Sequence, residues 1–90
     1  MSLYTSAYKG DREPDFVNEE GFSWWKQTTH YNAQKCSDLE SKKFSWWYVE
    51  GPDDTQRHIV LRHQEIVKDT TSLEDVAVFL DCMWIAFCTE

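Results

Sequence analysis

Residues 72–88 read SLEDVAVFLDCMWIAFC, and this stretch decides the fold because it predicts one long C-terminal helix. Thr71 stands three residues before Glu74, the spacing of a capping box, in which the two side chains satisfy backbone N–H groups of the first turn. Ser72 and Asp75 repeat the spacing one residue later. We therefore expect the helix to begin within one residue of Ser72.

Apolar residues recur along this helix at steps of three and four and define one broad face that suits a core. They are Leu73, Val76, Ala77, Leu80, Met83, Trp84 and Phe87. Val78, Cys82 and Ile85 form a second apolar stripe on the opposite side, which we call the back stripe. The back stripe is either buried within the same fold or available to another molecule, in which case it is the predicted interface of an oligomer.

The sequence before the helix has the character of β-strands. FSWWKQTTHY at residues 22–31 and FSWWYVE at 44–50 are rich in aromatic and β-branched residues, and RHIVLRH follows at 57–63. The turn sequence GPDD at 51–54 makes a hairpin of the last two. Residues 64–68 either continue the strand or fold back as a short edge. The expected fold is α+β, with an antiparallel sheet of three to four strands packed against one C-terminal helix.

Ninety residues allow one domain, so we treat residues 1–90 as a single unit. Residues 9–21 read KGDREPDFVNEEG and combine five acids with two glycines, which predicts an acidic loop or mobile arm. Residues 32–43 contain only Cys36 and Leu39 as apolar anchors. That stretch predicts a loop or one or two weakly held helical turns.

The charge balance limits the classes of partner. The chain has 16 acidic and nine basic residues, for a formal net charge of −7. Nonspecific nucleic-acid binding depends mainly on Lys and Arg that neutralise phosphates, and an anionic membrane surface requires the same charges. The longest apolar stretch is also shorter than the ~20 residues of a spanning helix. We expect a cytoplasmic protein whose partner is another protein with a basic surface, and we expect neither nucleic acid nor membrane as the partner.

The residues that could carry chemistry do not occur at the spacings that chemistry requires. His58 and His63 are five residues apart on a predicted strand and therefore point to opposite faces. Zinc sites need pairs of ligands at short spacing, and the three cysteines supply none. The three glycines are isolated, so there is no phosphate-binding loop. We expect no enzymatic activity, no cofactor and no metal site.

Two features predict a protein-binding surface. The tryptophans occur as adjacent pairs, 24–25 and 46–47, and neighbours on a strand face opposite sides, so one of each pair is available to a partner. The second feature is the dense acidity of the arm and of the turn after residue 50. The predicted protein-binding residues are Asp11, Glu13, Asp15, Glu19, Glu20, Trp25, Trp47, Glu50, Asp53 and Asp54.

These features favour a non-enzymatic protein-binding module. The sharper hypothesis is an acidic inhibitor or modulator of a basic, nucleic-acid-handling protein, with carboxylates placed where phosphates would lie. In size, acidity and lack of motifs the chain is similar to the small proteins with which phages and mobile elements block host defence systems. One alternative is a homo-oligomeric structural or assembly protein, such as a homodimer, built on the back stripe. Another is a single-stranded nucleic-acid binder that stacks bases on the aromatic sheet, which the net charge opposes.

Overall fold

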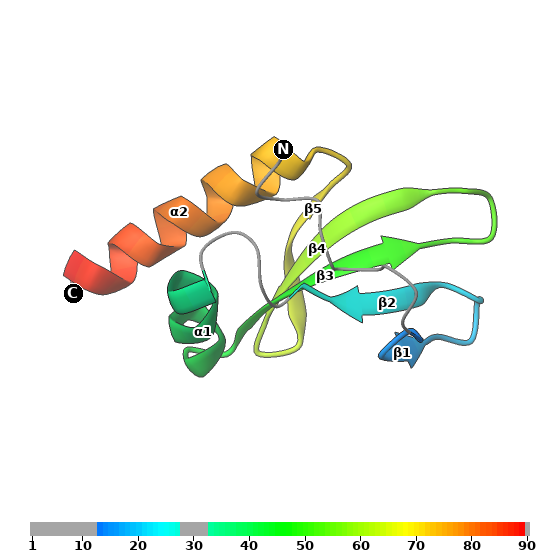
Figure 1. Cartoon of the computed structure of the whole chain (residues 1–90), viewed down its shortest axis with the longest axis horizontal. Helices are drawn as coiled ribbons and strands as arrows, with labels where there is room; N and C mark the ends of the chain where they lie inside the picture. Colours follow the sequence, from blue (N-terminus) through cyan, green and yellow to red (C-terminus); the bar gives the residue numbers. More distant parts are fainter. Residues whose placement is uncertain (1–12, 28–32, 90) are drawn as a thin grey trace.

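The computed structural model describes residues 13–27 and 33–89. Within these ranges five strands and two helices form the fold (Figure 1). In chain order they are β1 (Phe16–Val17), β2 (Ser23–Lys26), α1 (Ala33–Ser41), β3 (Phe44–Glu50), β4 (Gln56–Arg62), β5 (Glu65–Thr70) and α2 (Leu73–Thr89). The strands form one antiparallel sheet in the order β1-β2-β3-β4-β5. The predicted α+β fold is confirmed, with five strands instead of three to four.

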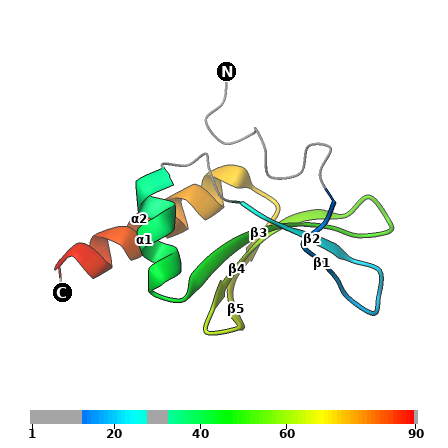
Figure 2. The same cartoon turned by 60° about the horizontal axis from the view of Figure 1, so that its bottom comes forward.

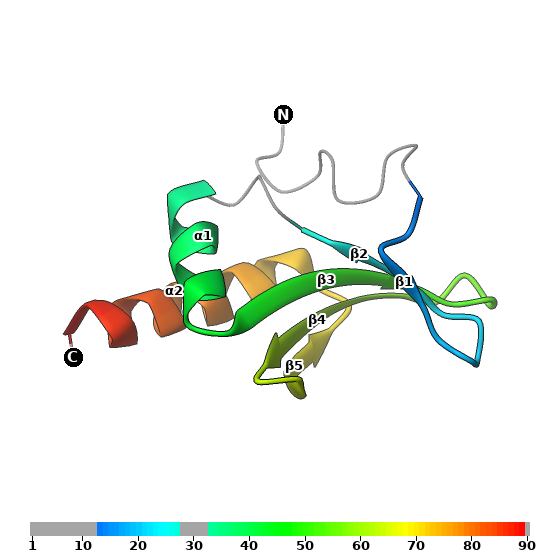
Figure 3. The same ribbon diagram turned by 90° about the horizontal axis from the view of Figure 1, so that it is seen from below.

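Both helices pack against one face of the sheet, near one end of β3 (Figures 2 and 3). Trp46 of β3 is paired with Val60 of β4, so their side chains share a face, and both contact helical residues in the core. The buried core cluster comprises Leu39, Phe44, Trp46, Val60, Val76, Ala77 and Leu80. We call the side of the sheet that carries Trp46 and Val60 the helix face and the opposite side the far face.

Helix α2 begins where the capping signal predicts. The backbone N–H of Asp75 donates a hydrogen bond to Oγ of Ser72 at 3.3 Å, so the second of the two predicted caps forms. Every residue of the predicted apolar face is buried in the core cluster or packed against it. The back stripe is not covered by this fold, since Val78 is 62% exposed, Ile85 is 60% exposed and Cys82 is also exposed.

The hairpin between β4 and β5 settles how residues 64–68 fold. His63 and Gln64 form a two-residue loop, and both have positive φ, at 51° and 72°. Two positive φ values are the signature of a type I′ turn, which matches the twist of the strands it joins. The chain therefore folds back, and β5 becomes an edge strand. The dipeptide His-Gln lacks the Asn-Gly or Asp-Gly signal that usually predicts such a turn.

The range 9–21, predicted as a loop or mobile arm, is described only from residue 13. Within it Phe16 and Val17 form β1, which pairs with β2 as the other edge of the sheet. The turn that follows is built by Asn18, whose Oδ1 accepts hydrogen bonds from the backbone N–H groups of Glu20 at 2.9 Å and Phe22 at 3.0 Å. This part of the acidic stretch is thus ordered by strand pairing and by one polar side chain.

Candidate functional site

The far face of the sheet carries three aromatic side chains that contact one another. Phe16 lies opposite Trp24 in the β1–β2 register, with ring centroids 6.2 Å apart and an interplanar angle of 69°. Trp24 in turn lies 6.0 Å from Trp47 of β3 at 72°. Both pairs adopt the edge-to-face arrangement that the ring quadrupoles favour. We call Phe16, Trp24 and Trp47 the aromatic row, in which Phe16 is 53% exposed and the two tryptophans are partly exposed.

The structure places only one of the two tryptophans predicted for binding on this surface. Trp47 belongs to the aromatic row, but Trp25 is paired with Tyr48 on the helix face and is only 6% exposed. The prediction of Trp25 therefore disagrees with its burial, and its neighbour Trp24 takes the surface position. Alternation showed that one member of the pair is inward, but only the register of β2 against β3 determines which one.

Two turns bring separate acidic stretches to the same end of the sheet. Ser23 is paired with Glu50, so the β1–β2 and β3–β4 turns are neighbours (Figure 1). The Phe22 ring of the first turn packs directly on Gly51 of the second. The acids gathered there, which we call the acidic end, are Glu19, Glu20, Glu50, Asp53 and Asp54. Residues 13–25 and 50–56 contain no Lys or Arg, so no basic side chain of these stretches neutralises the end.

The remaining predicted acids do not join this end. Asp15 is used by the fold, because its Oδ2 accepts the backbone N–H of Lys26 at 2.8 Å and its own N–H donates to the carbonyl of Trp24 at 2.9 Å. Glu13 is exposed two residues earlier. Asp11 lies outside the described residues. The acidic end thus includes five of the eight predicted acids, and it is formed by tertiary structure and not by the arm alone.

Most of the basic side chains near the sheet are engaged by residues of the same chain. Lys26 forms an ion pair with Glu40, and Arg57 Nε lies 3.3 Å from Asp69 Oδ1, an ion pair outside hydrogen-bond geometry. Two others lie over aromatic rings: Lys42 Nζ is 5.7 Å from the centroid of Phe87, and Arg62 Cζ is 5.4 Å from the centroid of Phe44. A nucleic acid stacked on the sheet would have to compete for these cations.

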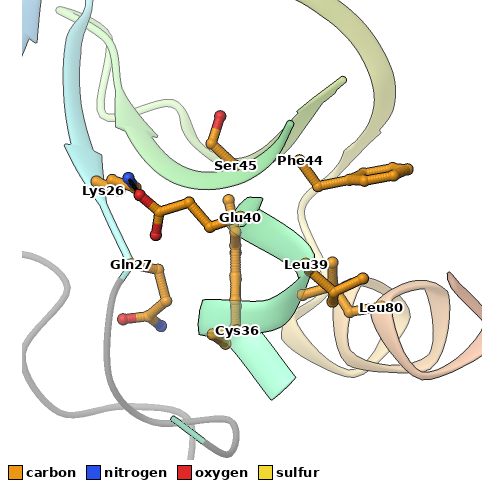
Figure 4. Close-up of a pocket in the computed structure, with 9 residues that line it drawn as sticks. Lys26, Gln27, Cys36, Leu39, Glu40, Phe44, Ser45 and Leu80 are labelled. Atoms are coloured by element: carbon orange, nitrogen blue, oxygen red, sulfur yellow. Dashed lines mark hydrogen bonds and ion pairs between the residues drawn. The ribbon is translucent and has the colours of Figure 1, made fainter. Parts of the chain in front are cut away.

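A small cavity between the end of β2, helix α1 and the start of β3 holds further polar groups (Figure 4). Gln27 lies directly after β2, is 3% exposed, and finds no hydrogen-bond partner for either side-chain amide atom in the part of the chain that the structure describes. Cys36 of α1 lines the same cavity. Burial, and secondarily the carboxylate of Glu40, raises the pKa of the Cys36 thiol. Because the thiolate is the nucleophile, this environment makes Cys36 a poor one.

The other polar groups do not converge on a reactive site. Among the described residues, no group of three or more His, Cys, Asp or Glu side chains is arranged to hold a metal ion. No helix in residues 13–27 and 33–89 has the length and apolar character needed to cross a bilayer. The surface that stands out is therefore the aromatic row with the adjacent acidic end. Sequence reasoning missed two of its members, Phe16 and Trp24.

Comparison with known proteins gives no relative from which a function could be transferred. No protein-family model matches the sequence, no curated protein matches it, and no solved structure matches the fold.

Proposed function

We propose that this chain is a non-enzymatic protein-binding module that binds a basic surface of another protein. The observation that carries the proposal is the position of the aromatic row directly beside the acidic end. Trp24 follows Ser23, which is paired with Glu50, so the aromatic row adjoins the acidic end along the sheet, although the Glu50 carboxylate itself lies on the helix face, where it accepts the Tyr48 hydroxyl at 3.2 Å. Large aromatic side chains are the residues that most often anchor interfaces, and charges around them steer the encounter.

The sharper form of the proposal is an inhibitor or modulator of a nucleic-acid-handling protein. Such a partner carries a basic surface that normally contacts phosphates, and carboxylates at the acidic end would compete for it. The formal charge of −7 and the lack of Lys and Arg in residues 13–25 and 50–56 support this form. We place the activity in the cytoplasm, in keeping with the expected reduced state of the three cysteines.

Affinity capture with matched variants tests the proposal. The wild-type chain is immobilised and exposed to a lysate of the source cell beside two variants, the double substitution Trp24→Ser with Trp47→Ser and the double substitution Asp53→Asn with Asp54→Asn. Asn suits position 54 because Asp54 has a positive φ of 59°, which Asn tolerates. Glu74→Gln, which removes one charge from the exposed side of α2, is the control for loss of a carboxylate elsewhere on the chain.

The expected result is one basic protein that binds the wild type and the Glu74→Gln control but neither double variant. Raising the salt from about 0.15 M to about 0.5 M should release it, because screening weakens the electrostatic part of the contact. Added duplex DNA should release it as well if the acidic end occupies a nucleic-acid site. If both double variants still retain the partner, the proposed surface is rejected. If the amount of bound partner does not depend on the salt concentration, the electrostatic component is rejected.

A homo-oligomeric structural or assembly protein is the second candidate function. It is favoured by the exposure of the back stripe, where Val78 and Ile85 each leave more than half of their surface uncovered by the fold. Apolar patches of this kind often mark contacts between proteins. If the stripe joins copies of the chain, Ile85→Glu should give a folded monomer by light scattering, and a monomeric wild type would rule the candidate out.

Single-stranded nucleic-acid binding has less support. Stacking of bases needs exposed aromatic rings together with cations that reach phosphates. Four basic side chains near the sheet, those of Lys26, Lys42, Arg57 and Arg62, contact other side chains of the chain. An electrophoretic shift at moderate salt would distinguish this function from the proposed one.

A further inference from the structure

A groove of about 510 Å³ crosses the far face of the sheet at the end opposite the acidic end. Its apolar part is formed by Trp47 and Leu61, which lie on the adjacent strands β3 and β4. Its rim is formed by Lys43, just after α1, and by the β4–β5 turn at His63 and Gln64. The backbone N–H of His63 donates a hydrogen bond to the carbonyl of Lys43 at 3.1 Å, which joins the two sides of the rim.

The groups around this groove are mainly hydrogen-bond donors. Lys43 contributes an ammonium group and Gln64 an amide N–H₂, and both residues are exposed. The Oγ of Ser45 accepts the indole N–H of Trp47 at 2.9 Å, which leaves the Ser45 hydroxyl hydrogen to point toward another acceptor. The acid of the rim, Glu40, is already paired with a lysine of β2. The groove therefore combines an apolar floor with a rim that favours a carboxylate.

We propose that this groove binds an acidic peptide segment of a partner protein, in which a large apolar side chain lies next to an aspartate or glutamate. The apolar side chain packs on Trp47 and Leu61, and the carboxylate is held by Lys43 with help from the donors of the rim. The choice of occupant rests on charge complementarity. It does not rest on the proposed function, which uses the acidic end and the opposite charge, but the two surfaces share Trp47, so variants of Lys43 and not of Trp47 tell them apart.

The net negative charge of the chain does not oppose a short acidic ligand at this position. Lys43, which would hold the carboxylate, precedes β3, and Glu50 ends it; the seven residues of the strand, at about 3.3 Å each, place the two roughly 20 Å apart. Charges interact weakly beyond the Debye length of about 8 Å at physiological salt. A nucleic-acid strand would instead continue along the sheet toward the carboxylates of Glu50 and its neighbours, so a short peptide is the better occupant.

Titration with short blocked peptides, followed by ¹⁵N-resolved NMR, tests the assignment. The probes are a hexapeptide with two aspartates flanking a Leu-Phe pair, the same peptide with two lysines in place of the aspartates, and an aspartate peptide with glycines in place of Leu-Phe. The indole N–H signal of Trp47, identified by its loss in Trp47→Phe, reports on the floor of the groove. The first peptide should shift this signal saturably, and the other two should bind at least about fivefold more weakly.

Substitutions on the rim complete the test. Lys43→Glu should lower the affinity for the acidic peptide by about fivefold or more. Lys42→Glu should leave this affinity unchanged, because Lys42 lies over the Phe87 ring and does not line the groove. Lys43 has a positive φ of 73°, so Lys43→Asn, which suits that backbone, is a second neutralising variant should the glutamate disturb folding. Equal binding of the lysine peptide, or no effect of either Lys43 variant, overturns the proposal. It is also overturned if the Trp47 signal shifts more strongly with oligothymidylate, or with protein concentration alone.

Discussion

The indole N–H of Trp46 donates a hydrogen bond to Nδ1 of His58 at 3.2 Å, between strands β3 and β4 and away from solvent. Because Nδ1 is the acceptor, the imidazole is neutral and carries its hydrogen on Nε2. Burial also lowers the pKa of His58, since the charged ring would lose its hydration. The fold therefore holds His58 in its neutral form, and charging this ring would cost stability.

The first prediction is a loss of stability on mild acidification. A histidine whose pKa is lowered in the folded state binds protons more readily in the unfolded state, so the free energy of unfolding falls as pH decreases. The contribution of His58 is complete above its unfolded pKa of about 6.5 and is lost as pH falls toward the folded pKa. Urea unfolding between about pH 7.5 and pH 5.5 measures the effect.

His58→Gln should flatten this dependence while lowering stability at pH 7.5, because it removes both the titrating ring and its contact with Trp46. His63→Gln is the matched control, since His63 is exposed at the β4–β5 turn and the slope with pH should survive its loss. Equal slopes for the wild type and for His58→Gln would contradict the prediction.

The tryptophan pairs show how far the sequence determines the binding surface. Alternation along a strand predicts that Trp24 and Trp25 face opposite sides, and the structure agrees. Which residue is inward depends on the pairing of Lys26 with Trp47 across two strands separated by helix α1. That register is a long-range property, and the local pattern FSWW occurs in the same form in both strands.

The secondary-structure elements also differ in how far the local sequence determines them. Helix α2 could be predicted because Ser72 provides a local cap and the apolar residues recur over several turns. Strand β1 could not be predicted, because Phe16 and Val17 are too few to show a period and are held by pairing with β2. The β4–β5 turn is a third case, since Gln64 adopts a positive φ that its residue type does not favour.

The second prediction concerns the contact between the two acidic turns. Gly51→Ala should lower the free energy of unfolding by about 1 to 3 kcal/mol, because a methyl group at residue 51 would overlap the Phe22 ring and lie 2.9 Å from its Cδ1 atom. In a Phe22→Ala background the same substitution should cost less than about 0.5 kcal/mol, since the obstructing ring is gone. Chemical denaturation of the wild type, the two single variants and the double variant measures the coupling free energy between residues 22 and 51. Purely additive costs would refute the contact.

The third prediction concerns the buried amide of Gln27. Leaving both amide atoms without partners costs about 1 to 3 kcal/mol, so Gln27→Leu should raise the free energy of unfolding by a similar amount. Gln56→Leu, on an exposed position of β4, is the control and should change stability by no more than about 0.5 kcal/mol. A destabilised Gln27→Leu protein would mean that ordered water satisfies the amide in solution.

The fourth prediction separates the two apolar sides of helix α2. Leu80 is buried in the core cluster and Val78 is exposed on the back stripe, although both are large aliphatic residues of the same helix. Leu80→Ala should therefore cost about 2 to 5 kcal/mol of stability through lost burial and the cavity it leaves. Val78→Ala should change the stability of the monomer by less than about 0.5 kcal/mol, because most of its side chain is already in contact with solvent.

Denaturation at two protein concentrations distinguishes a monomer effect from an assembly effect for this pair. If Val78→Ala lowers stability only at the higher concentration, the back stripe is covered by another copy, because association stabilises a folded state by mass action. If it costs as much as Leu80→Ala at every concentration, the position of α2 against the sheet is wrong. Equal stability of wild type and Val78→Ala at both concentrations would argue against self-association through Val78.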